Sequence, residues 1–259
     1  MRVALSENGR DFSLPEVAAT PQNFEEGMRL FEFLAKKLVG DKKLIAACGG
    51  IAGPFNKEKT MLINAPHLPN WINQPLVERL GRILNCHVYL ENDAALGGLG
   101  EAIRGAGQGE KIVAYITVGT GVGGARIVDG KIDVSAFGFE PGHQIIQSDG
   151  GRWEDFVSGS GWQKRYQQLP TETTDERLWD EGARWLAVGL HNAILFWSPN
   201  VVIFGGSMIL GAKSISLAAT QNHLKEINKI FPEIPPVKKA LLGDLVGLQG
   251  ALAFLKQKS

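Results

Sequence analysis

The sequence contains few cysteines, no excess of charge of either sign and no long apolar segment. Cys48 and Cys86 are the only cysteines among 259 residues, which argues against a disulfide framework and a cysteine-rich zinc site. Basic and acidic residues, 27 of each, leave a net charge of zero and indicate no binding surface for nucleic acid or an anionic membrane. No signal peptide is visible, and the apolar stretches are interrupted well before a membrane-spanning length. We therefore expect a small-molecule partner and a cytoplasmic location.

Apolar residues make up 44% of the chain, which is enough for a large packed core, and they follow an alternating α/β pattern. The helix expected at 23–40 begins with a capping box, Asn23 and Glu26, and stops at Gly40. Further helices are expected at 75–84, 93–103, 175–197 and 245–257, and strands at 1–6, 43–49, 86–90 and from 201. This order predicts two α/β lobes with a cleft between them.

The stretch "YITVGTGVGGARIVDG" holds four glycines and two threonines within residues 117–124. Glycine lets backbone N–H groups turn inward on an anion, and threonine hydroxyls add donors, so a phosphate cradle is one interpretation. The letters also satisfy the dinucleotide pattern GxGxxG at Gly119, Gly121 and Gly124. That pattern needs a following helix, whereas "GGARIVDGK" predicts a second strand that turns at 129–130. A tight hairpin without a ligand is the third interpretation.

Several motifs follow one another in an order that resembles one family. They are "LENDA" after a strand, "TVGTGVGG", "EPGH", the glutamate of "GRWEDFVSG" and "VVIFGGS". Together they resemble the ROK-family sugar kinases of the glucokinase type, and the resemblance runs across nearly the whole chain. It implies an α/β, two-lobed fold of the actin and hexokinase ATPase type with ribonuclease H-like lobes. Residues 1–104 would form the small lobe, completed by the C-terminal helix 245–259, and residues 105–244 the large lobe.

The resemblance implies that Asp93, where a strand ends and a helix begins, is the general base. It would take the proton from the sugar hydroxyl that attacks the γ-phosphate. Aspartate there is also a favoured helix N-cap, which is the structural alternative. Asn92, whose amide offers a donor and an acceptor to a diol, matches a sugar contact of the family, as do Glu140, His143 and Glu154. By residue type alone, each of these is an ordinary polar loop residue.

Residues 117–124 resemble the family's second phosphate loop. Thr117, Gly119, Thr120 and Gly121 are its expected nucleotide contacts, and the glycines would let backbone amides approach the phosphates of ATP. ATP and Mg²⁺ are the cofactors that the resemblance implies.

Other glycine turns resemble the borders of the same cleft. Gly205 and Gly206 resemble the turn on the adenosine side, although an ordinary strand-to-helix turn has the same letters. Gly50 and Gly53, in "GGIAGP", resemble a turn that lines the cleft, with a plain strand-ending turn as the alternative. Asn64, in "NAPHLPNW", lies in the segment that leads into the family's sugar pocket, and a solvent-facing loop residue is the alternative there.

The sequence departs from the family pattern at its start. The family carries a DxGGT motif on its first strand, and "MRVALSENG" resembles the strand that follows it. The missing aspartate would help to hold Mg²⁺ through water, and the missing glycines would form the first phosphate loop. Because that strand is central in the small lobe, its absence predicts unpaired backbone groups within a sheet. Two explanations are open. Either Met1 is an internal methionine mistaken for a start, or the chain is a truncated or degenerate copy.

A second departure concerns zinc. Many relatives follow the ExGH motif with CxCGxxGCxE, whose three thiolates bind a structural Zn²⁺ together with the histidine, whereas the corresponding stretch here is "SDGGRWE". Because no cysteine is present there, we expect no structural zinc, and His143 stays a candidate sugar contact.

The motifs together predict an ATP-dependent, glucokinase-like kinase that phosphorylates the 6-hydroxyl of a hexose, with lobe closure excluding water. A sugar-binding ROK protein without kinase activity is the alternative, because the first phosphate loop is absent. A ROK-type transcriptional repressor is disfavoured, since no helix-turn-helix module precedes the sugar domain. The expected partners are a hexose and ATP, with neither nucleic acid nor membrane. A homodimer, which relatives commonly form, is compatible with the sequence, and hexoses and N-acetylated hexoses both remain open as substrates.

Overall fold

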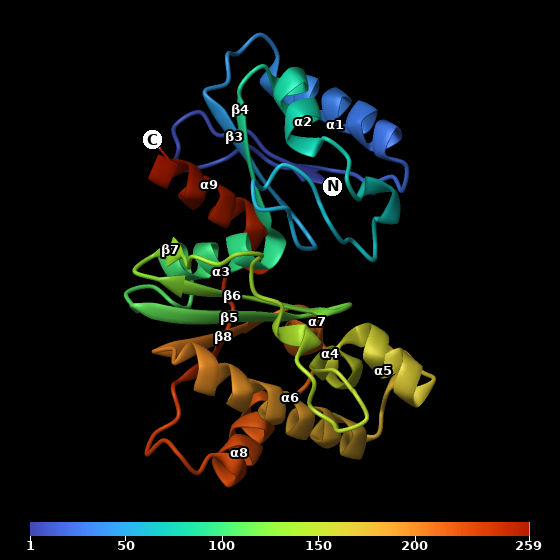
Figure 1. Cartoon of the computed structure of the whole chain (residues 1–259), viewed down its shortest axis with the longest axis vertical. Helices are drawn as coiled ribbons and strands as arrows, with labels where there is room; N and C mark the ends of the chain where they lie inside the picture. Colours follow the sequence, from blue (N-terminus) through green and yellow to red (C-terminus); the bar gives the residue numbers. More distant parts are fainter. Residues whose placement is uncertain (259) are drawn as a thin grey trace.

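The strands form three separate sheets, and the helices lie around them (Figure 1). The computed structural model describes residues 1–258. Its strands are β1 (Arg2–Val3), β2 (Glu16–Val17), β3 (Ala46–Ile51), β4 (His87–Asn92), β5 (Ile112–Val118), β6 (Val122–Val128), β7 (Lys131–Ile132), β8 (Val201–Gly205) and β9 (Val237–Lys239). Its α-helices are α1 (Phe24–Val39), α2 (Leu76–Leu84), α3 (Asp93–Arg104), α4 (Trp153–Val157), α5 (Gly159–Tyr166), α6 (Glu176–Trp197), α7 (Ser207–Leu210), α8 (Leu217–Ile227) and α9 (Val246–Lys258). Short 3₁₀ helices are η1 (Pro69–Trp71), η2 (Pro141–His143), η3 (Pro170–Glu172) and η4 (Gly243–Leu245).

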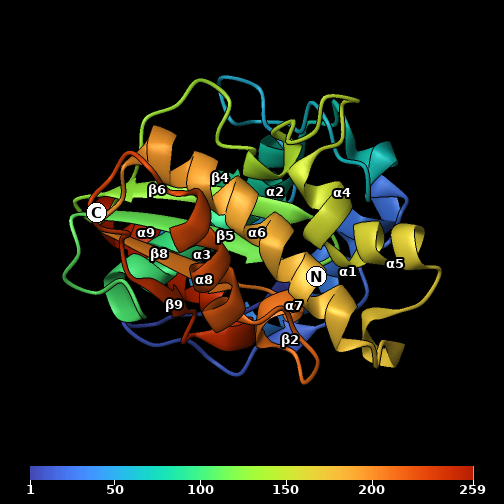
Figure 2. The ribbon, with the colours of Figure 1, turned by 90° about the horizontal axis from the view of Figure 1, so that it is seen from below.

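The largest sheet has the strand order β7-β6-β5-β8-β9. Its central strand, β5, runs antiparallel to β6 and parallel to β8. Successive side chains of a strand point to opposite faces. Ala114, Ile116 and Val118 accordingly join the core with α4, α6 and α8, whereas Val113 and Tyr115 join the core with α3 and α9. Figure 2 shows α6 and α8 across the first of these faces.

The helix ends agree with the local signals of the sequence. Asn23 caps α1, and its side chain accepts a hydrogen bond from the N–H of Glu26 at 3.1 Å. The helix ends at Gly40, as predicted. Asp175 caps α6 in the same way, and that helix ends at Trp197. Among residues 1–258, no helix combines the length and the apolar character that crossing a membrane requires.

The strand expected at 43–49 is wrong at both ends, because β3 is Ala46–Ile51. Its parallel pairing with β4 continues through both glycines of the strand to Ile51. A Cβ on Gly50 would lie 3.3 Å from the Cα of Asp93. Gly50 therefore marks a close approach of β3 to the start of α3, rather than the end of the strand that its type suggested.

The remaining strands form two pairs rather than one sheet. β1 and β2 are antiparallel and β3 and β4 are parallel, and no ladder joins β1 to β3 within residues 1–258. Between the pairs lies a cavity of about 450 Å³, whose wall includes Val3 of β1, Gly49 of β3, Met28 of α1 and Val246 of α9. The β1–β2 pair is antiparallel, like β7–β6 of the large sheet. The β3–β4 pair is parallel, like β8–β9. Among residues 1–258, no strand lies between these pairs as β5 lies between β6 and β8.

Helices α3 and α9 cross between the large sheet and the strands β3 and β4 (Figure 1). Small residues allow the crossing to be close. A Cβ on Gly250 would lie 1.8 Å from the carbonyl oxygen of Leu96, and one on Gly100 would lie 2.7 Å from the carbonyl oxygen of Val246. The division of the chain into lobes at residue 104 stays a prediction, and the two helices form the contact between the sheets.

We expect Gly250→Ala to destabilise the protein, because the new Cβ would force α9 away from α3. Overpacking a core costs about 1–3 kcal/mol, and we expect a loss of about 2 kcal/mol or more in the free energy of unfolding measured in urea. Gly247→Ala is the matched control, since a Cβ at that position of α9 meets nothing within 4 Å. It should leave the free energy unchanged or slightly raised. Equal losses in the two variants would contradict the close crossing.

Candidate active site

The junction of β4 and α3 places Asn92 and Asp93 side by side. Asn92 is the helix N-cap, because its Oδ1 accepts hydrogen bonds from the N–H groups of Ala94 and Ala95 at 2.9 and 3.2 Å. Asp93 is the first residue of α3, and its Oδ1 accepts from the N–H of Ala94 at 2.8 Å. The alternative in which Asp93 is the N-cap is therefore wrong. The cap occupies the amide oxygen of Asn92, whose Nδ2 lies 3.4 Å from the carbonyl oxygen of Gly53.

Two carboxyl groups of the site have pKa values above their ordinary range. Burial raises the pKa of Asp93, and hydrogen bonding to the N–H of Ala94 opposes the rise. Burial also raises the pKa of Glu140; His143 lowers it, and the charges of Asp93 and Glu154 raise it further. Asp93 and Glu140 both keep surface that is exposed to solvent. The fold thus brings Asp93, Glu140, His143 and Glu154 into one electrostatic environment.

The turn between β5 and β6 is held from one side by the start of α5. The N–H groups of Gly159 and Ser160 donate to the carbonyl oxygens of Gly119 and Thr120 at 2.7 and 3.2 Å. In a planar trans peptide the next N–H points opposite to the carbonyl. The N–H groups of Thr120 and Gly121 therefore point away from α5. Consecutive amides on the free side of a glycine turn are suitable donors for an anion.

The four glycines of this stretch have two different tasks. Gly123 and Gly124 lie in β6 rather than in the turn. A Cβ on Gly123 would lie 3.1 Å from the Cβ of Ala94, and one on Gly124 would lie 2.7 Å from the Cγ of Pro141. The explanation of all four glycines by phosphate contact is wrong for these two, because they admit α3 and η2 against the strand. The dinucleotide pattern also fails, since β6 follows where that pattern needs a helix.

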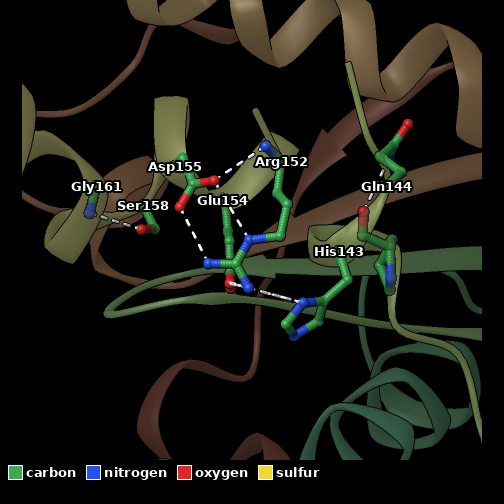
Figure 3. A network of polar contacts seen from close by, with 8 residues as sticks. His143, Gln144, Arg152, Glu154, Asp155, Ser158 and Gly161 are labelled. Carbon is green, nitrogen blue, oxygen red and sulfur yellow. Dashed lines mark hydrogen bonds and ion pairs between the residues drawn. The ribbon is translucent and has the colours of Figure 1, made fainter. Parts of the chain in front are cut away.

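Glu154 and His143 meet at Arg152, a residue that the motif comparison did not single out (Figure 3). Arg152 Nη1 lies 3.0 Å from His143 Nδ1 and 3.1 Å from Glu154 Oε1. Arg152 Nε and Nη2 donate to the carboxylate of Asp155 at 3.3 and 3.2 Å. The sequence offered one signal for it, namely its position two residues before Glu154 in "GRWEDFVSG".

The segment that carries His143 is anchored from the other side by Gln144 (Figure 3). Gln144 Nε2 donates to the carbonyl oxygen of Pro141 at 3.0 Å, and Gln144 Oε1 accepts from Asn192 Nδ2 of α6 at 2.8 Å. The carbonyl oxygen of Gln144 accepts from the N–H of Trp153 at 2.9 Å. The position of His143 thus depends on contacts with both α4 and α6.

The two expected nucleotide turns lie at the same edge of the large sheet. β5 and β8 are parallel neighbours, and Thr117 is opposite Gly205. Carboxyl ends of parallel strands form a common edge where ligands bind in open α/β sheets. Gly206 has a φ of +87°, and a Cβ there would lie 2.3 Å from the carbonyl oxygen of Val118. Only glycine therefore permits the chain to leave β8 so close to β5.

The remaining predicted positions border Asn92 and Asp93. Gly53 has a φ of +121°, and a Cβ there would lie 2.3 Å from the carbonyl oxygen of Asn64. Asn64 is exposed and meets Gly53 through its backbone. Gly50 lies against Asp93. Within residues 1–258, no group of three or more histidine, cysteine, aspartate and glutamate side chains is arranged to hold a metal ion.

Comparison with known proteins gives consistent matches. The chain is 28% identical over 260 residues to a glucokinase of Streptomyces coelicolor, covering 83% of this chain and 81% of that protein. The structure of a ROK hexokinase from Thermus thermophilus matches with a TM-score of 0.81 and 25% identity, over 97% of this chain and 93% of that chain. A ROK family glucokinase from Streptomyces griseus in complex with glucose and AMPPNP matches with a TM-score of 0.81 and 24% identity, over 99% and 96%.

These matches show the two-lobed α/β fold of the actin and hexokinase type that the motif order predicted. A sequence model described as the ROK family matches residues 2–258. The match covers all three sheets, the β5–β6 turn and Asp93. The chain therefore belongs to the ROK family.

Proposed function

We propose that this protein is an ATP-dependent kinase that phosphorylates the 6-hydroxyl of a hexose. The observation that carries the proposal is the position of Asp93. This carboxyl is open to the cleft, has a raised pKa and lies in the electrostatic environment of Glu140. It stands at the start of α3, against which the β5–β6 hairpin packs. The matching glucokinase, ROK hexokinase, and glucokinase in complex with glucose and AMPPNP support the same reaction.

Asp93 would act as the general base of this reaction. Its carboxylate would accept the proton of the sugar hydroxyl as that oxygen attacks the γ-phosphate. A pKa above the ordinary value makes the ionised carboxylate a stronger base. The hydrogen bond from the N–H of Ala94 to Asp93 Oδ1 restricts rotation of the side chain. Because phosphoryl transfer depends chiefly on positioning and charge stabilisation, one placed carboxylate is enough.

Glu140, His143 and Glu154 would hold the sugar hydroxyls, since carboxylates accept hydrogen bonds and an imidazole N–H donates one. Asn92 would contribute less than its residue type suggested. Its amide oxygen already accepts two hydrogen bonds from the start of α3, so its amide N–H₂ is the group that remains for a sugar oxygen. We therefore expect Asn92 to donate a hydrogen bond to the sugar diol but not to accept one.

Residues Thr117 to Gly121, from the end of β5 through the β5–β6 turn, would hold the phosphates of ATP. The N–H groups of Thr120 and Gly121 face away from α5, on the side where an anion could approach. Gly205 and Gly206 would border the adenosine at the neighbouring strand end. Mg²⁺, when bound with ATP, would neutralise charge on the transferred phosphoryl group. The glycines of both turns would let a nucleotide approach the backbone closely, because glycine has no Cβ atom.

A sugar-binding protein without kinase activity is the second candidate, and the cavity between β1 and β3 is the observation that favours it. The wall of this cavity includes Asp93 and Thr117, so the proposed base and phosphate turn border an opening. We infer that a DxGGT strand would fit there, antiparallel to β1 and parallel to β3, as β5 lies between β6 and β8. Without that strand, the phosphates would be held from one side only.

We expect Asp93→Asn to lower kcat for hexose phosphorylation by about 10²–10⁴-fold, the usual contribution of a general base. Hexose affinity, measured by calorimetry, should stay close to that of the parent. Because burial raises the pKa of Asp93, the ionised carboxylate destabilises the fold at neutral pH, and the variant should be at least as stable as the parent. Asp129→Asn is the control, since Asp129 has a φ of +49° that asparagine also adopts. Retained turnover in Asp93→Asn would remove Asp93 as the base.

The raised pKa of Asp93 predicts the acid side of the pH profile. As pH falls through the folded-state pKa, which lies above the ordinary 3.8, the base becomes protonated and kcat should fall. Glu140 also has a raised pKa, so Glu140→Gln at saturating hexose separates the two groups. The acid limb should persist in that variant. Its disappearance would assign the limb to Glu140 instead.

The contribution of an inserted strand can be measured by comparing two chains. One is the chain of 259 residues, and the other is extended at its N-terminus by a strand bearing DxGGT. We expect phosphorylation of a hexose panel to be much faster in the extended chain, because its turn would add donors around the phosphates. Equal activity in both chains would show that the β5–β6 turn suffices. Hexose binding without turnover in both would establish the non-catalytic candidate.

A further inference from the structure

Arg152 occupies the point where two residues of the proposed sugar site meet (Figure 3). Its Nη1 lies 3.0 Å from His143 Nδ1 and 3.1 Å from Glu154 Oε1. Nε and Nη2 of the same guanidinium donate to Asp155. The backbone N–H of Arg152 also donates to Asp155 Oδ2 at 2.9 Å. Asp155 thus binds the edge of the guanidinium formed by Nε and Nη2, whereas Nη1 faces His143 and Glu154.

A short hairpin brings Arg152 back beside His143. Ile145 and Arg152 form an antiparallel bridge, and the N–H of Ile146 donates to the carbonyl oxygen of Gly151 at 2.9 Å. The chain therefore reverses between 145 and 152 and places the arginine next to the segment that it left. The contact between Arg152 and His143 closes the base of this hairpin.

The contact determines which nitrogen of His143 carries the proton. A guanidinium has five N–H donors and no acceptor. His143 Nδ1 must therefore accept, and the proton of the neutral ring lies on Nε2. The ring consequently presents an N–H donor at Nε2, the form that suits a sugar oxygen. Without Arg152, the two neutral tautomers would compete and part of the population would present an acceptor there.

The same nitrogen orients Glu154. Arg152 Nη1 holds Glu154 Oε1, and the position of a Cβ on Gly121 lies 3.3 Å from Glu154 Oε2. One oxygen of this carboxylate is thus directed at Arg152 and the other toward the β5–β6 turn. His143 Nδ1 itself is 3.9 Å from Glu154 Oε1, so the arginine bridges two groups that do not bond well directly.

We propose that Arg152 is the positioning residue of the sugar site: it holds His143 in the Nε2–H tautomer and fixes the carboxylate of Glu154. This inference rests on the proposed function, because it assigns His143 and Glu154 to sugar binding. The side chains of Arg152 and His143 are 42% and 48% exposed. Exposed ion pairs contribute little to stability. Arg152 therefore acts on the site more than on the fold, and its variants should remain folded.

The test compares Arg152→Met with Arg152→Lys, with Arg177→Met as the matched control. Arg177 forms an arginine–aspartate pair with Asp175 at the start of α6. We expect Arg152→Met to raise the KM for glucose about tenfold, as the loss of a positioning partner does. The kcat should stay within about twofold, because the interaction holds substrate in ground and transition states alike. Arg152→Lys should recover part of the loss, since one ammonium cannot reproduce the fork, and the KM for ATP should not change.

Nitrogen-15 NMR of the imidazole rings gives a readout that does not depend on activity. The chain has five histidines, and a His143→Gln variant assigns the signal of His143. We expect the Nε2–H tautomer in the parent and a mixture of tautomers in Arg152→Met. If no hexose is bound or phosphorylated by the parent, the proposed function fails, and the NMR result still decides the effect of Arg152 on His143.

Three outcomes would overturn the inference. The first is the Nδ1–H tautomer in the parent. The second is an Arg152→Met variant with unchanged tautomer and unchanged KM for glucose. The third is a loss of stability or of kcat with an unchanged KM, which would assign Arg152 a purely structural role at the start of α4.

Discussion

The close packing of α3 is the constraint on which the rest of the structure depends. This helix carries Asp93 as its first residue and packs against β5, β6 and α9. Gly97 and Gly98 face Tyr115, where a Cβ on either would lie 2.9 Å from the nearest atom. A glycine costs a helix about 1 kcal/mol relative to alanine. The helix therefore depends on its packing between the large sheet and the β3–β4 pair more than on its own propensity, and any displacement would move the proposed base with it.

Three segments far apart in the sequence meet around this helix. The β4–α3 junction supplies Asp93, the β5–β6 turn supplies backbone amides, and η2 with α4 supplies His143 and Glu154. Contacts at Gly123 and Gly124 hold the hairpin against α3 and η2. Burial raises the pKa of both Asp93 and Glu140, and the charges of Asp93 and Glu154 raise the pKa of Glu140 further. Such clusters of perturbed groups occur most often where chemistry requires them.

The large sheet and the two strand pairs on the other side of α3 and α9 are built differently. The large sheet has a central strand, β5, that joins an antiparallel pair to a parallel pair. The β1–β2 and β3–β4 pairs have the same directions, with a cavity of about 450 Å³ between them. An internal sheet edge leaves N–H and C=O groups without ladder partners, which is unfavourable in an apolar surrounding. Residues of α1 and α9, including Met28 and Val246, line this region.

The sequence by itself determined the features that depend only on residues close together along the chain. The cap at Asn23, the stop at Gly40 and the β5–β6 hairpin were predicted correctly because each signal acts within a few residues. The order of motifs determined the family and the two-lobed fold for the same reason, since each motif is a short local pattern. Asn64, Glu140, His143 and Glu154 could be named from that order but not placed relative to one another.

The tertiary structure decided what depends on residues that are distant in sequence. Asn92 rather than Asp93 caps α3, because the chain direction on leaving β4 sets which oxygen reaches the helix N–H groups. Small residues are needed at Gly123 and Gly124 because α3 and η2 approach β6 closely. No local sequence pattern indicates this approach. The role of Arg152 arises from the hairpin that returns it to His143. Contacts of this kind are set by the packing of whole elements, whereas a sequence pattern reports only the conformation that a segment prefers locally.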